Sequence, residues 1–89
     1  GLAEPVGNMN WSLFPNPSNG AINIHYGGSN EQARIEILDL SGRLIHSEQR
    51  YLSNGQRITL DLNGRLANGA YNVRLTTSTG RSVQRVVVE

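Results

Sequence analysis

Apolar and polar residues alternate in short runs along most of this chain. The clearest runs are Gly20–Tyr26, Ala33–Ile37, Ile58–Leu62 and Tyr71–Leu75. Successive side chains of a β-strand point to opposite faces, so this period of two residues predicts strands with one buried face. Glycine and asparagine are frequent between the runs, and pairs such as Asn54-Gly55 are typical of hairpin turns. No segment has a convincing helical period.

The pattern predicts seven strands, at residues 11–14, 20–26, 33–40, 43–48, 58–62, 71–76 and 82–88. Turn signals recur roughly every ten residues, which is typical of sandwiches. We therefore predict an all-β, immunoglobulin-like β-sandwich of about seven antiparallel strands in two sheets. Two packed sheets give every alternating strand an apolar surface to cover its buried face.

Details of the pattern add three expectations. Leu38 and Leu40 fall out of phase with the preceding apolar residues, and a bulge or bend near Leu38-Asp39 would reconcile the two runs. Phe14, Tyr26 and Tyr71 lie on the parity expected for the core. Tyr71 also stands where immunoglobulin-like folds carry a corner tyrosine, whose hydroxyl bonds to upstream backbone.

Length and composition narrow the function. The 89 residues suit one domain, which we place at residues 11–89, with residues 1–10 as a linker or a cloning remnant. No apolar run approaches the roughly 18 residues of a membrane span. The eight basic residues are all arginines, spread along the chain, and the net charge is +1. A nucleic-acid-binding domain would show a basic stripe, so we expect no nucleic-acid partner.

Candidate catalytic and metal-binding residues are few. The chain has no cysteine, and its histidines are His25 and His46. A zinc site needs three or four ligands at suitable spacing, and these two do not supply it. Asp39 lies in a turn sequence, where its carboxylate can accept backbone N–H bonds, and Asp61 lies between two leucines and faces outward or toward a neighbouring strand. We therefore expect no catalytic residue, no metal and no cofactor.

Three segments, in this order, carry a resemblance. They are Leu13–Gly20 (LFPNPSNG), Ile35–Leu44 (IEILDLSGRL) and Leu66–Leu75 (LANGAYNVRL). Together they resemble the C-terminal sorting domain (type A) of the type IX, or Por, secretion system of Bacteroidetes. The resemblance covers about residues 12–88. The positions that match the sorting motifs of this family are Pro15, Pro17, Gly20, Asp39, Gly42, Gly69 and Tyr71.

The resemblance implies a secretion signal and no enzyme. Such domains follow a cargo protein, to which they are covalently fused, and reach the periplasm on a longer precursor with its own signal. The outer-membrane translocon then recognises the domain, and a cell-surface sortase usually removes it. The resemblance thus implies that the cargo is secreted or displayed on the cell surface.

The last strand is our candidate for recognition, because an edge strand offers free backbone donors and acceptors. Its residues are Arg85, Val86, Val87, Val88 and Glu89. Such a strand also offers a route to a strand-swapped or edge-paired homodimer, which stays open as an alternative to a monomer. A second function also stays open, namely an immunoglobulin-like carbohydrate-binding or adhesion module of an extracellular enzyme. An exposed, coplanar Trp11 and Tyr51 would favour this second function.

Overall fold

A computed structural model describes residues 10–15, 18–62, 64–78 and 80–89. Within these ranges the chain forms seven strands and no helix, so none of the described segments is a helix that could cross a membrane. The strands are β1 (Trp11–Phe14), β2 (Ala21–Tyr26), β3 (Glu31–Asp39), β4 (Leu44–Leu52), β5 (Arg57–Asp61), β6 (Gly69–Thr77) and β7 (Gly80–Val88). The predicted linker (except Asn10) and the motif residue Pro17 lie outside the described residues.

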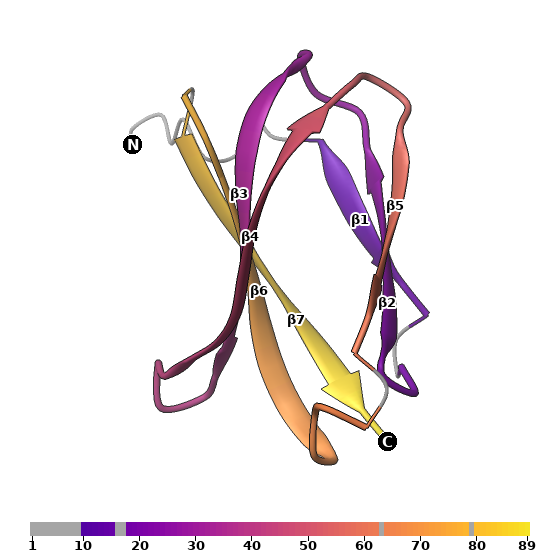
Figure 1. Ribbon diagram of the computed structural model, residues 1–89, viewed down its shortest axis with the longest axis vertical. Coiled ribbons are helices and arrows are strands. Elements are labelled where there is room, and N and C mark those ends of the chain that lie inside the picture. Colours follow the sequence, from indigo (N-terminus) through magenta and orange to yellow (C-terminus); the bar gives the residue numbers. More distant parts are fainter. Residues whose placement is uncertain (1–9, 16–17, 63, 79) are drawn as a thin grey trace.

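The strands form two sheets that face each other (Figure 1). One sheet has the order β1-β2-β5, and the other has the order β4-β3-β6-β7. All pairs of neighbouring strands are antiparallel. The predicted two-sheet, immunoglobulin-like sandwich is therefore confirmed. β7 is an edge strand of the larger sheet, as expected for the last strand.

The turn at Asn54-Gly55 differs from its prediction. The pair was expected to close a hairpin, but β4 and β5 belong to different sheets, so this turn carries the chain across the sandwich. The backbone and side-chain amides of this turn bond to the end of β2 and to the connection that follows it. The Gly55 amide donates to the Tyr26 carbonyl (2.7 Å), and the Asn54 side-chain amide donates to the Gly27 carbonyl (2.9 Å).

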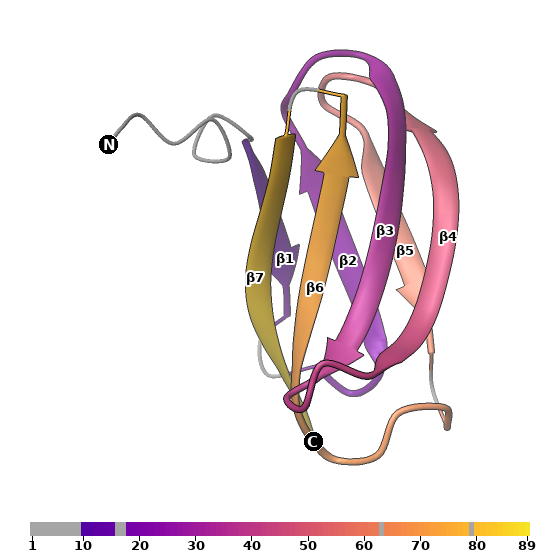
Figure 2. The same ribbon diagram turned by 90° about the vertical axis from the view of Figure 1, so that its left-hand side faces the viewer.

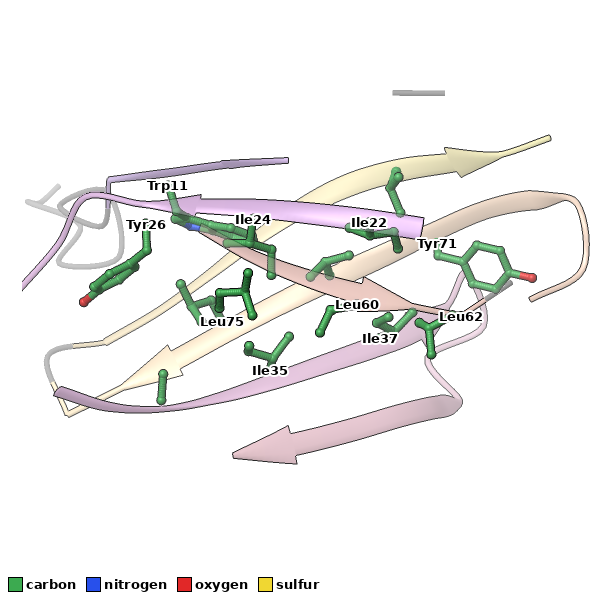
Figure 3. Close-up of a cluster of buried hydrophobic side chains, with 14 of the residues drawn as sticks. Trp11, Ile22, Ile24, Tyr26, Ile35, Ile37, Leu60, Leu62, Tyr71 and Leu75 are labelled. Carbon is green, nitrogen blue, oxygen red and sulfur yellow. The ribbon is translucent and has the colours of Figure 1, made fainter. Parts of the chain in front are cut away.

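The core fills the space between the sheets (Figure 3). Alternate residues of β2, β3 and β6 point into it, as the period of two residues predicted. Ile22, Ile24, Ile35, Ile37 and Leu75 are fully buried. Each such side chain stabilises the fold by about 1.5–3 kcal/mol relative to an exposed one. The core thus fixes which face of each strand is inward.

Phe14 does not belong to this core, so its predicted position is wrong. Trp11 and Leu13 are the β1 residues that pack against the buried cluster. Phe14 is half-buried, and the Arg57 guanidinium lies 5.4 Å from the centre of its ring. This cation–π contact comes from Arg57 at the start of β5, which belongs to the same sheet as β1. Parity failed here because both parities of this short strand carry an apolar side chain.

The register shifts between Ile37 and Leu38, where the sequence predicted a bulge or bend. The additional residue belongs to β4: His46 pairs with Ile37, whereas Leu44 pairs with Leu38. Ile45, the residue passed over, packs against the core. The shift therefore does not bring Leu38 and Leu40 into the core. Leu38 is half-buried on the outer face, and Leu40 is exposed in the turn.

Candidate recognition surface at one end of the sandwich

The three motif segments gather with the last strand at one end of the molecule, the lower end in Figures 1 and 2. Strand register places them there. Asp39 pairs with Tyr71, and Tyr71 pairs with Val86 on its other side. Gly69 pairs with Val88. We call this region the motif end; it comprises Pro15, Ser18–Gly20, Asp39–Arg43, Gly69–Tyr71 and Arg85–Glu89.

Ser18 joins the first motif to the last strand. It is a buried polar residue and forms a parallel bridge with Val88. The Ser18 amide donates to the Val87 carbonyl (2.7 Å), and the Glu89 amide donates to the Ser18 carbonyl (2.8 Å). A segment that lies about seventy residues away in sequence therefore pairs with the outer edge of β7. This pairing corrects the expectation of a freely open edge at the C-terminal end of β7.

The Ser18 side chain organises the motif segment locally. Its hydroxyl donates to the Ala21 carbonyl (2.9 Å) and accepts from the Gly20 amide (3.0 Å). Gly20 has a φ of 111°, a region that side chains disfavour, which explains the glycine at this motif position. Sequence reasoning did not single out Ser18. A serine beside Asn-Gly signals a local turn, but no local pattern reveals its bridge to β7.

A side chain from β7 also reaches the first strand. The Gln84 side-chain amide donates to the Trp11 carbonyl (2.7 Å). Val86 and Val88 point into the core, whereas Arg85 and Glu89 are exposed. The side chains of Val86 and Val88 therefore anchor one face of the predicted recognition strand in the core. Hydrogen bonds at Gln84 and Val87 hold the strand at its edge. Of the residues predicted for recognition, the exposed ones are Arg85 and Glu89, and Val87 is half-buried.

The second motif is a rigid turn built by one carboxylate. Asp39 accepts hydrogen bonds from the Ser41 amide (3.0 Å), the Ser41 hydroxyl (2.7 Å) and the Arg43 amide (2.9 Å). The Arg43 Nε adds an ion pair at 3.2 Å. These donors, the Ser41 hydroxyl first, hold the pKa of Asp39 below its ordinary value. Gly42 completes the turn with a φ of 94°. The predicted turn role of Asp39 is confirmed.

The third motif contains the predicted tyrosine corner. The Tyr71 hydroxyl donates to the Ala67 carbonyl at 2.6 Å, and the ring is buried. This bond ties the connection between β5 and β6 to Tyr71, near the start of β6. Because Tyr71 pairs with Asp39 and with Val86, it also lies between the second motif and the last strand. The corner prediction is therefore confirmed.

The remaining candidate residues lie apart. His25 and Asp61 are exposed, whereas His46 bonds to Glu48 at 2.8 Å on β4. The described residues contain no group of three or more side chains that could hold a metal. Trp11 is 6% exposed and Tyr51 is 58% exposed, so these two rings do not form the exposed platform that a carbohydrate-binding module would need.

These features define an immunoglobulin-like β-sandwich whose sequence motifs assemble at one end. The model of the secretion system C-terminal sorting domain family matches residues 12–89, and the chain belongs to this family, the sorting domain of type IX secretion. Membership implies a fused cargo, the secretion machinery as partner, and export to the cell surface or beyond.

A comparison of structures shows the same fold elsewhere. The crystal structure of CopC from Methylosinus trichosporium OB3b is similar, with a TM-score of 0.56 and 23% sequence identity. The similarity covers 90% of this chain and 94% of CopC. At this identity the likeness shows the fold alone. No curated protein matches the chain.

Proposed function

We propose that this domain is a non-enzymatic address that directs its fused cargo through the outer-membrane type IX translocon, and that a cell-surface sortase then removes it. The supporting observation is the assembly of the motif end. Three motif segments, distant in sequence, meet there with Val86–Glu89 through backbone pairing. An unfolded chain would not present them together. The proposed signal is therefore the folded end, not a linear peptide.

The motif residues have two separable roles in this proposal. Gly20 and Gly42 build the turns, because their positive φ angles favour glycine, and Tyr71 builds the corner through its side-chain hydroxyl. Exposed side chains of the motif end then meet the translocon. Arg85 and Glu89 belong to this exposed group. The carbohydrate-binding alternative receives no support from the aromatic residues, since Trp11 is part of the core.

A fusion experiment tests the proposal. Residues 1–89 would be placed behind a signal peptide and a fluorescent protein in a Bacteroidetes host with a working type IX system. The expected result is reporter on the cell surface or in the medium. The same fusion in a host without the translocon is the control and should stay in the periplasm. Periplasmic retention of the fusion in the working host would contradict the proposal.

Deletion of Val86–Glu89 examines the last strand. We expect the shortened fusion to stay in the periplasm, because the deletion removes two core residues and the edge bonded to Ser18. Normal surface export of the shortened fusion would contradict a role for this strand.

A further inference from the structure

The second edge strand of the larger sheet, β4, carries polar and charged side chains on the face that looks toward the smaller sheet. Among the described strands β4 pairs with β3 alone, and Figure 2 shows it at the flank of the sandwich. His46, Glu48 and Arg50 each pair with a buried residue of β3. Paired residues share one face of a sheet, so all three point inward. We call them the inward row.

Hydrogen bonds join the inward row into one network. His46 Nε2 bonds to Glu48 Oε1 at 2.8 Å, and Arg50 Nε donates to the other oxygen of the same carboxylate. Burial alone would raise the pKa of Glu48, but the bonds from His46 and Arg50 hold it below its ordinary value. Glu48 is therefore ionised at neutral pH and lies between its two neighbours.

Water still reaches the inward row from the open side of β4. The side chains of His46 and Glu48 are 18% and 25% exposed, and that of Arg50 is 42% exposed. A strand that paired with the free edge of β4 would lay its own inward side chains beside the row and displace this water. Ionised groups lose favourable solvation on burial, and their attraction to one another often fails to compensate for the loss. Strand addition at this edge is therefore unfavourable.

The position of the inward row separates it from an ordinary surface patch. The inner face of β4 is apolar near both of its ends, where Ile45 packs against the core and Leu52 is fully buried. Polar groups occupy the stretch between them, on a strand of nine residues. A long edge strand is a template for pairing with another chain, and inward-pointing charges are one way in which sheets prevent it.

We propose that the inward row closes the β4 edge to strand addition by a second copy of this chain. The opposite edge strand, β7, is covered at its C-terminal end by Ser18. Each edge strand of the larger sheet therefore carries its own barrier to pairing. The inference opposes an edge-paired homodimer through β4, which the sequence left open.

Two sets of substitutions on β4 test the inference in the isolated 89-residue chain. H46V with E48V and R50V replaces the inward row with a residue that favours strands. It removes one negative and one positive charge, so the net charge at pH 7 stays at +1. S47V with Q49V is the control, because it adds valines to the exposed outer face of the same strand and keeps the inward row. Sedimentation velocity at rising concentration measures self-association, and hydrogen exchange of the β4 amides locates it.

We expect wild type and S47V with Q49V to sediment as monomers. The inward-row variant should self-associate at concentrations about tenfold or more below any at which wild type does so, with slower exchange of its β4 amides. H46T with E48T and R50T removes the same charges without adding comparable apolar surface. It should also self-associate, and it replaces the valine variant if that protein fails to fold.

Three results would overturn the inference. The first is an inward-row variant that folds and stays monomeric, and the second is equal self-association of S47V with Q49V. The third is a monomeric threonine variant beside a self-associating valine variant, because added apolar surface and not lost charge would then drive the pairing. The measurement needs no secretion machinery, so its result is independent of the export experiment.

Discussion

The Ser18 amide donates to the Val87 carbonyl at 2.7 Å and so pairs with the outer edge of the last strand at its C-terminal end. The Glu89 amide returns a bond to the Ser18 carbonyl. A free edge of this kind invites pairing with other chains. The first motif therefore has a physical role, which is to hold the C-terminal end of β7 in place and to cover the edge of the strand at that end.

Substitution of Ser18 should loosen this junction. Ser18→Ala removes the hydroxyl bonds to Ala21 and Gly20, and we expect a loss of about 1–2 kcal/mol in the free energy of unfolding. Ser12→Ala is the matched control, because Ser12 is an exposed serine of β1, and it should change stability by less than about 0.5 kcal/mol. Urea unfolding of both variants measures the difference. Equal stability of the two would contradict the role of Ser18.

The tyrosine corner should contribute a measurable part of the stability. Tyr71→Phe keeps the buried ring and removes the donor to the Ala67 carbonyl, which should cost about 1–2 kcal/mol. Tyr51→Phe removes a hydroxyl from an exposed ring and should cost less than about 0.5 kcal/mol. Thermal unfolding compares them. The corner would be energetically unimportant if Tyr71→Phe melted at the wild-type temperature.

The Asp39 turn should weaken in acid. The pKa of Asp39 is lowered in the folded protein, so its carboxylate stabilises the fold fully above the ordinary value of 3.8. This contribution is lost as the pH falls through the lower, folded pKa. Asp39→Asn should therefore be less stable than wild type at pH 7, and the gap should narrow in strong acid. Urea unfolding as a function of pH measures this, and a gap independent of pH would contradict it.

The Ser41 hydroxyl is the largest cause of the lowered pKa. Ser41→Ala should therefore raise the pKa of Asp39 toward 3.8, because the carboxylate loses its donor at 2.7 Å. An NMR titration of the Asp39 side chain reads this value directly. Ser47→Ala, at an exposed position of β4, is the control and should leave the titration unchanged.

The sequence predicted the strands well because burial of one face imposes a period of two residues. It also located the Asp39 turn and the Tyr71 corner, since both depend on local chemistry. The hairpin prediction at Asn54-Gly55 was wrong because a turn signal shows that the chain reverses, not which sheet it joins. Phe14 was misplaced because the short β1 has an apolar residue on both parities.

The motif end was only partly predictable. The motif positions were visible in the sequence, yet their meeting at one end depends on pairing between distant strands. Ser18 was missed for the same reason. The exposed leucines were missed because leucine suits a core. In the structure Leu38 keeps the outward parity of β3, Leu40 lies in the turn, and the register shift in β4 leaves Leu44 on the outer face.

The central claim is that the folded end, and not the linear sequence, is the signal. Ile35→Asp places a charge in the core at a fully buried position and should unfold the domain while keeping the seven matching motif positions and all of β7. Arg34→Asp introduces the same side chain at the adjacent exposed position and should leave the fold intact. Export of the reporter fusion is the measurement. The account predicts export of the Arg34→Asp fusion and periplasmic retention of the Ile35→Asp fusion, whereas export of an unfolded Ile35→Asp domain at the wild-type level would contradict it.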